Sequence, residues 1–171
     1  MILKLDHVPT VLVAENEEPH RFVLKRVFRR LGIEVRLQFV EDGQQLLDYL
    51  TRSGIYADTE KSPWPDLVLI DLHMPRLGGI EALEVMHASA ALCIVPTIVF
   101  SSSNSPHHID QAYASGANAY LVKAGDFNEL ATHLRAMMTF WLQVARLPRC
   151  LPVEDQTTQE DPHSSATDPN T

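Results

Sequence analysis

The chain has few of the features that mark secreted, membrane-spanning or nucleic-acid-binding proteins. Only two of its 171 residues are cysteines, and Cys93 and Cys150 show no metal-ligand spacing, so a reducing cytoplasm is the expected setting. No apolar run approaches the roughly 20 residues that a membrane-spanning helix needs, and the N-terminus lacks the apolar core of a signal peptide. With 22 acidic and 14 basic residues, the chain also lacks the basic surface that nucleic-acid binding requires.

The length and the composition predict one globular domain followed by a tail. Hydrophobic residues make up 45% of the chain and charged residues 21%, which is ordinary for a domain with a substantial core. Beyond Pro148 the composition changes to Pro, Thr, Asp, Gln and Ser, with almost no apolar residues. We therefore expect a domain over residues 1–148 and a disordered tail over residues 149–171.

Strand patterns and helix patterns alternate five times. The predicted strands are Val11–Ala14, Glu34–Phe39, Leu67–Ile70, Thr97–Phe100 and Ala119–Val122. The predicted helices cover residues 19–30, 44–50, 80–88, 107–115 and 127–147. The strand Glu34–Phe39 alternates in polarity, as an edge strand does. Because single helices connect the strands, the pattern predicts a doubly wound α/β fold, with a five-stranded parallel sheet between two helical layers.

Polar side chains follow four of the five predicted strands. Glu15 and Asn16 follow the first, Asp71 ends the third, Ser101 follows the fourth and Lys123 ends the fifth. In a parallel sheet these positions share one edge, where open α/β sheets bind their ligands. Carboxylate and amide oxygens suit Mg²⁺, and a hydroxyl and an ammonium can hold anionic oxygens. This combination is what phosphoryl transfer onto a carboxylate requires.

With these residues, the chain resembles a response-regulator receiver domain over about residues 11–148. The resemblance implies a flavodoxin-like, three-layer αβα fold. It rests on Glu15-Asn16, Asp71 in Asp-Leu-His-Met-Pro, Gly78-Gly79, Ser101 after Pro-Thr-Ile-Val-Phe, and the run Gly116–Lys123. Within the family, the chain is most similar to single-domain regulators paired with phytochrome-type histidine kinases. That similarity rests on Leu46–Leu50, the long loop ending at Leu67, and Phe140–Pro148.

The resemblance implies how a phosphoryl group and a metal ion would be held. Asp71 would accept the phosphoryl group from a phosphohistidine of a partner kinase. Mg²⁺ would be held by Glu15, Asn16, Asp71 and the backbone carbonyl of His73.

It also implies a switch. Ser101 and Lys123 would bind phosphoryl oxygens. Ser101 would move together with Tyr120, an aromatic residue that rotates inward and reshapes the surface around the fifth strand. A local electrostatic event would thereby bias the packing of a two-state element.

Two positions depart from the family pattern. Asn16 stands where a second acidic residue is usual, and Ala124 stands where proline usually follows the lysine. A cis bond before a residue other than proline costs about 2.5–4 kcal/mol, so we expect a trans bond before Ala124 and a shifted loop. The missing charge at Asn16 predicts weak Mg²⁺ binding. It also leaves open an alternative function, a receiver-fold interaction module that acts without phosphorylation.

An enzymatic alternative is disfavoured. A phosphohydrolase with an aspartate nucleophile usually carries a second aspartate two residues later, and here that position holds His73. We expect a regulator without enzymatic turnover, whose output passes through protein contacts rather than through nucleic acid or membrane. A homodimer through the last helix is expected, with Phe140, Trp141 and Leu147 at its apolar centre.

Two further groups of residues, one basic and one of histidines, are expected to be exposed to solvent and to form no metal or nucleic-acid site. The five basic residues between Arg21 and Arg30 are expected to form a solvated helix face, with some role in docking a kinase. The eight histidines show no zinc-like spacing, so we expect solvated side chains and no histidine metal site.

Overall fold

The structure, a computed structural model, describes residues 7–148, so the predicted tail over residues 149–171 lies outside the described part. All strand pairs are parallel, and the sheet order is β2-β1-β3-β4-β5. The predicted parallel α/β sheet is therefore confirmed, with β2 at one edge. The strands are β1 (Thr10–Ala14), β2 (Arg36–Val40), β3 (Leu67–Ile70), β4 (Thr97–Ser101) and β5 (Ala119–Val122).

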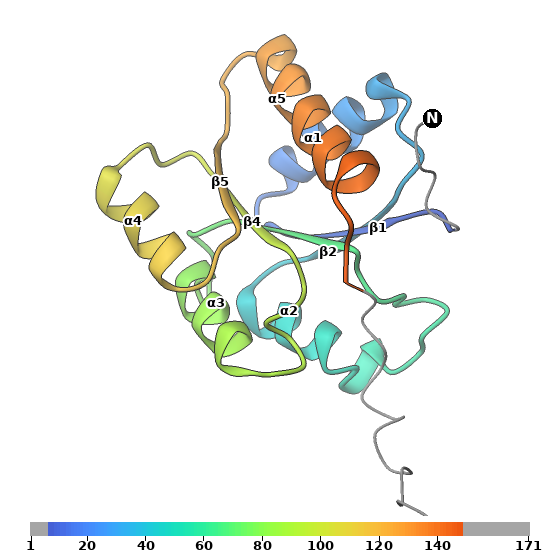
Figure 1. Ribbon diagram of the computed structural model, residues 1–171, viewed down its shortest axis with the longest axis vertical. Helices are drawn as coiled ribbons and strands as arrows, with labels where there is room; N and C mark the ends of the chain where they lie inside the picture. The colour runs from blue at the N-terminus through green and yellow to red at the C-terminus, as the bar shows by residue number, and fades with distance from the viewer. Residues whose placement is uncertain (1–6, 149–171) are drawn as a thin grey trace, which may run out of the picture.

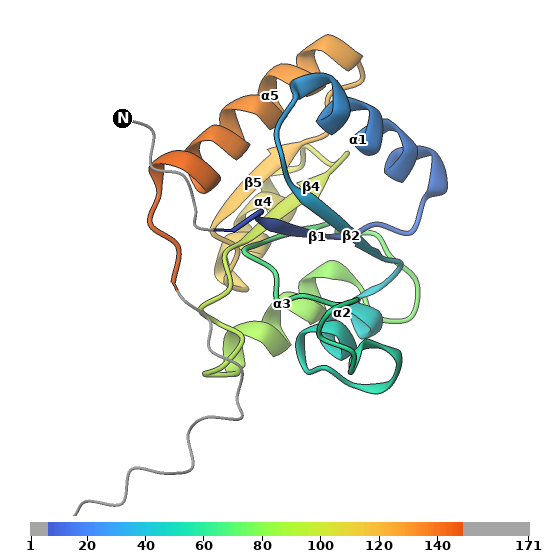
Figure 2. The same ribbon diagram turned by 90° about the vertical axis from the view of Figure 1, so that its right-hand side faces the viewer.

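Helices cover both faces of the sheet, as Figures 1 and 2 show. One layer contains α1 and α5, and the other contains α2, α3 and α4. The helices are α1 (Glu18–Leu31), α2 (Gly43–Leu50), α3 (Gly79–Ala88), α4 (Pro106–Ala114) and α5 (Phe127–Thr139), with short 3₁₀ and π turns at η1 (Gly54–Tyr56) and η2 (Phe140–Val144). Among residues 7–148, none of these helices has the length and apolarity needed to cross a membrane.

The central strands β1, β3 and β4 are buried along their whole length and mostly apolar, because each faces two cores. In β1, Leu12 packs with the α2–α3 layer, whereas Val11 and Val13 pack with α1 and α5. β3 divides in the same way, with Val68 on one side and Leu69 on the other. Burial on both faces is the physical reason for uninterrupted apolar runs in parallel sheets.

The last helix is shorter than predicted. α5 ends at Thr139, and a single π turn follows it, closed by the Ala145 N–H donating to the Phe140 carbonyl over 2.7 Å. The wider turn keeps Leu142 in the core. The apolar spacing continues through this segment, so periodicity alone predicted an unbroken helix to Leu147.

The described part of the chain contains no cis peptide bond, so the bond between Lys123 and Ala124 is trans, as predicted.

Gly79 fits α3 against the end of β3. A Cβ atom at this position would lie well under 3.0 Å from the carbonyl oxygen of Asp71 and would also crowd Leu72. The Gly79 N–H donates to the Leu72 carbonyl over 3.0 Å, which closes the loop between β3 and α3. The absence of a side chain at Gly79 therefore sets the path of the segment that carries Asp71.

We expect Gly79→Ala to lower the free energy of unfolding by about 1–3 kcal/mol, because the added methyl group meets backbone atoms that cannot move independently. The matched control is Gly125→Ala, since a Cβ at Gly125 meets nothing within 4 Å. Urea unfolding of both variants measures the difference. Equal stability of the two would contradict the proposed steric role of Gly79.

Candidate functional site

Four polar residues lie at the carboxyl edge of the sheet. Glu15 follows β1, Asp71 follows β3, Ser101 ends β4 and Lys123 follows β5. They are almost entirely buried, with Glu15 1%, Asp71 6% and Ser101 0% exposed. The structure thus brings together the residues that the sequence placed at separate strand ends.

The ammonium group of Lys123 lies between the two carboxylates. Its Nζ atom is 2.5 Å from Glu15 Oε2 and 2.7 Å from Asp71 Oδ2. The Lys123 N–H also donates to the Ser101 carbonyl over 2.8 Å, which holds the backbone at the end of β5. Two carboxylates share one cation, so the cluster carries a formal excess of negative charge. Such an excess favours a divalent cation.

Asp71 is held in one orientation. Its Oδ1 atom accepts a hydrogen bond from the Leu72 N–H over 2.6 Å, and its Oδ2 atom faces Lys123. The His73 N–H lies 3.5 Å from Oδ1, at the limit of a hydrogen bond. The His73 side chain is exposed, so only its backbone belongs to the site.

Asn16 provides the test of whether the residues fit a metal ion. Its Oδ1 atom is buried and has no hydrogen-bond partner among the described residues. An acceptor without a donor costs about 1–3 kcal/mol when buried, and a cation would satisfy it. Together with Glu15 and Asp71, this oxygen forms a donor set that fits Mg²⁺.

A histidine lies closer to this site than the sequence suggested. His20 Nδ1 is 3.5 Å from Glu15 Oε1 and 3.8 Å from Glu17 Oε2. These three ligand atoms all lie within 4.8 Å of one another. The interpretation of His20 as merely solvated was therefore incomplete. The available signal was the spacing of three residues between Glu17, which precedes α1 as its N-cap, and His20 in its first turn.

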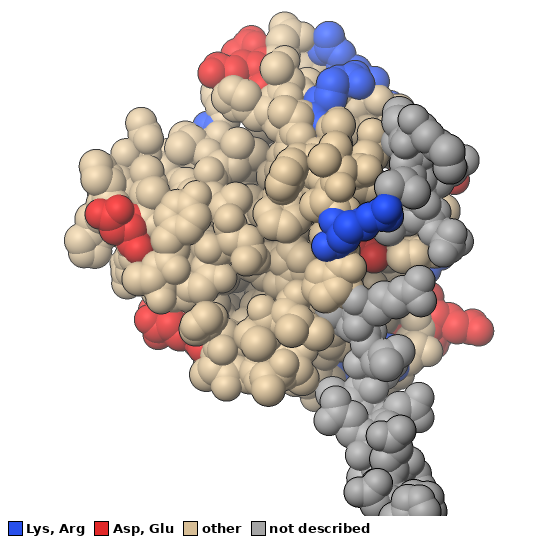
Figure 3. All heavy atoms as spheres, viewed as in Figure 1, with Lys and Arg blue, Asp and Glu red and all other residues tan. Residues whose placement is uncertain are grey.

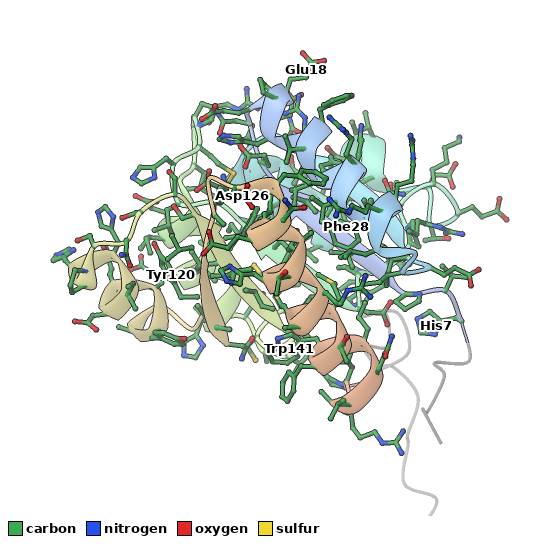
Figure 4. The ribbon with its side chains drawn as sticks, turned by 90° about the horizontal axis from the view of Figure 1, so that it is seen from above. His7, Glu18, Phe28, Tyr120, Asp126 and Trp141 are labelled. Carbon is green, nitrogen blue, oxygen red and sulfur yellow. The ribbon has the colours of Figure 1, made fainter. Side chains whose placement is uncertain are left out.

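The predicted switch residues are connected through Ser103, which sequence reasoning missed. The Ser101 Oγ atom accepts a long 3.4 Å bond from the Ser103 N–H, and the Tyr120 hydroxyl donates to the Ser103 carbonyl over 3.0 Å. The Ser103 Oγ atom lies 2.7 Å from His108 Nδ1. Figure 4 shows Tyr120 on β5 between α4 and α5. A movement of Ser101 would therefore reach both Tyr120 and the start of α4.

Two charged residues outside the predicted site hold its loops. Arg21, expected on a solvated face, is only 16% exposed and bonds the backbone after β1. Asp42 is fully buried, caps α2 through the Gln45 N–H at 2.8 Å, and pairs with Arg76 in the loop after Asp71. An Asp immediately before an amphipathic run is a recognisable cap signal. Nothing in the sequence indicated the contacts of Arg21, because its position fits the polar face of a helix.

The fold and the site together define a receiver domain. The model of the response regulator receiver domain family matches residues 11–135, and the chain belongs to that family.

Several solved regulators are similar to the chain. RPA3017, a response regulator in red light signalling of R. palustris, is 39% identical, with a TM-score of 0.79 over 82% of this chain and 99% of that one. The phosphorylated cyanobacterial phytochrome response regulator RcpA is 25% identical, with a TM-score of 0.76 over 83% and 99%. The Mn²⁺-bound form of Rcp1, a response regulator from Synechocystis, is 26% identical, with a TM-score of 0.73 over 82% and 99%.

We expect Asn16→Asp to tighten Mg²⁺ and Mn²⁺ binding about tenfold or more, because unit charges about 4 Å apart interact by roughly 4 kcal/mol at an effective dielectric near 20 before solvent relaxation. Calorimetric titration of both proteins measures the change. The matched control is Asn128→Asp, which adds the same charge at the start of α5. Equal affinities for the native and Asn16→Asp chains would show that the side chain at position 16 does not contribute to cation binding.

Proposed function

We propose that this receiver domain accepts a phosphoryl group on Asp71 from a sensor histidine kinase and signals through protein contacts. The observation that supports this most strongly is the contact of the Lys123 ammonium with the buried carboxylates of Asp71 and Glu15. A carboxylate beside a fixed ammonium can act as a nucleophile while the cation neutralises an incoming phosphoryl oxygen.

Each residue around Asp71 would have a separate role in the phosphoryl transfer. Lys123 exchanges part of its contact with Asp71 for a phosphoryl oxygen, and the Ser101 hydroxyl donates to another. The Leu72 N–H keeps the Asp71 carboxylate oriented throughout. A divalent cation, held by Glu15, Asn16, Asp71 and the His73 carbonyl, would supply further charge neutralisation.

We further propose a phytochrome-type kinase as the partner. The similar proteins support this, because RPA3017 acts in red light signalling and RcpA is a phytochrome response regulator. The chain matches nearly the whole length of both structures, so the likeness is not confined to one part of the domain.

One observation favours a second function, an interaction module that works without phosphorylation. In the structure Lys123 already neutralises part of the charge on Glu15 and Asp71, and Asn16 adds no charge for a cation. A chain with this site could keep its fold and its contacts without a phosphoryl group. The phosphorylation experiment below separates the two functions.

The native chain should form one acyl-phosphate, on Asp71, when it is incubated with a small-molecule phosphodonor or with a phosphorylated kinase. Asp71→Asn removes the nucleophile and keeps the shape, so it should abolish the modification. Asp110→Asn, at an exposed acid on α4, should leave it unchanged. Intact-protein mass spectrometry is the measurement. An acyl-phosphate that survives Asp71→Asn contradicts the proposal, and an unmodified native chain favours the second function.

We also propose that the chain forms a homodimer through η2, the π turn that follows α5. Phe140 is 52% and Val144 64% exposed, and the Phe140 ring meets Trp141 edge to face at 5.3 Å. Figure 3 shows few charged side chains over α4, β5 and the end of α5. Trp141 and Leu147, which the sequence also assigned to the dimer, pack partly against their own core. Phe140 and Val144 therefore offer the larger free apolar surface.

If this surface dimerises, the double variant Phe140→Ala, Val144→Ala should weaken the dimer at least tenfold, since buried aromatic anchors often contribute about 2 kcal/mol or more each. Ile55→Ala is the control, because Ile55 is 85% exposed but lies in η1, between α2 and β3. Sedimentation velocity over a concentration series measures both. A native chain that stays monomeric at high concentration, with and without phosphodonor, refutes the dimer.

A further inference from the structure

The loop between β1 and α1 carries Glu15 and Asn16, and the side chain of Arg21 holds its backbone. One guanidinium nitrogen of Arg21 donates to the carbonyl of Glu15 over 2.8 Å and to the carbonyl of Asn16 over 2.9 Å. The Arg21 side chain is only 16% exposed, so these bonds are shielded from water. The backbone of Arg21 is anchored as well, because its N–H donates to the Glu17 carbonyl over 3.1 Å.

The same guanidinium reaches the neighbouring strand. Its second terminal nitrogen lies 3.3 Å from Glu41 Oε1, and Glu41 directly follows β2. The Glu41 backbone is itself held, because its N–H donates to Gln45 Oε1 of α2 over 3.1 Å. Since β1 and β2 are paired along their whole length, Arg21 ties together the loops that leave two adjacent strands.

This arrangement matters for the side chains that face the site. Once the chain leaves β1, the carbonyls of Glu15 and Asn16 no longer belong to the sheet and need other donors. Holding two successive carbonyls with one rigid group restricts the backbone dihedrals of both residues. Those dihedrals set the directions of the Cα–Cβ bonds from which the Glu15 carboxylate and the Asn16 amide extend. The planar guanidinium is suited to such simultaneous contacts, whereas a lysine presents its donors from a single flexible point.

We propose that Arg21 is a positioning residue for the divalent-cation site at Glu15, Asn16 and Asp71. It acts through the two backbone carbonyls and contacts neither the cation nor Asp71. The inference rests on the proposed function only in taking this cation site as the one used for phosphorylation. Residues that orient metal ligands without touching the metal typically lower the metal affinity by about 10–100-fold when they are mutated.

Electrostatics gives the proposal a sharp test, because its two effects have opposite signs. Arg21 is itself positively charged, so removing its charge alone would strengthen the binding of a nearby cation. Removing its hydrogen bonds would release the loop and weaken binding. The sign of the change therefore distinguishes a positioning role from a general charge effect.

The experiment measures Mn²⁺ and Mg²⁺ affinity by calorimetry for the full chain and three variants. Arg21→Met removes the charge and every donor but keeps an apolar stem. Arg21→Lys keeps the charge but loses the planar fork. Arg29→Met is the matched control, because Arg29 lies on the exposed face of the same helix and its substitution changes the net charge equally. Urea unfolding without metal ions gives the stability of each protein.

We expect Arg21→Met to weaken cation binding about tenfold or more, Arg21→Lys to lie between it and the native chain, and Arg29→Met to bind like the native chain. A variant that remains folded at the titration temperature cannot lose affinity through lowered stability alone, so this result identifies positioning. Unchanged or tighter binding by Arg21→Met overturns the proposal. If that variant does not fold, Arg21→Lys decides, and native affinity in Arg21→Lys overturns it.

The outcome is separable from the proposed function. Native affinity in the Arg21 variants, with Asp71 still phosphorylated in the native chain, overturns the role of Arg21 alone. A native chain that binds neither Mn²⁺ nor Mg²⁺ overturns the positioning role together with the metal-dependent part of the proposed function.

Discussion

The contact of one ammonium with two buried carboxylates is the constraint on which the rest of the site depends. Glu15 and Asp71 are carried by neighbouring strands and would repel each other without a cation between them. Lys123 reaches them from β5, which is separated from β3 by β4. The contact therefore requires the whole parallel sheet, with the carboxyl ends of all the strands at the same edge. Removing one member of such a buried set leaves an uncompensated charge, which is costly in a poorly solvated environment.

The loops around this cluster are held from several sides. Asp42 caps α2 and pairs with Arg76 beyond Asp71, the Gly43 N–H donates to the Leu77 carbonyl over 2.9 Å, and Arg21 holds the carbonyls after β1. These groups stiffen the loops after β1 and β3. The loop after β4 differs in that its hydrogen bonds involve Ser103, Tyr120 and His108 rather than Asp and Arg side chains. Hydrogen bonds of this kind can be exchanged at low net cost, which suits a segment that responds to a change at Asp71.

The chemical character of the surface also differs from one region to another. The layer of α1 and α5 contributes basic side chains, two of which, Arg26 and Arg30, lie over the Phe127 ring. The π turn η2 after α5 instead presents apolar groups, with Phe140 exposed while Leu142 remains buried. The basic layer and the apolar turn after α5 are thus chemically different regions of the surface.

The sequence by itself determined the strand and helix order, because apolar runs and amphipathic periods report which faces are buried whatever their partners are. It also located Glu15, Asp71, Ser101 and Lys123, since polar residues after buried strands stand out against their surroundings. Even so, the same periodicity could not reveal the π turn after Thr139, because the apolar spacing continues through it. Only the tertiary structure decided which polar groups work together. The sharing of Lys123, the bonds from Arg21 to two carbonyls and the role of Ser103 join residues from different parts of the fold. The Asn16 Oδ1 atom, in contrast, is left without a hydrogen-bond partner among the described residues. Such contacts depend on the orientation of side chains in the packed fold, and no local pattern along the chain encodes that orientation.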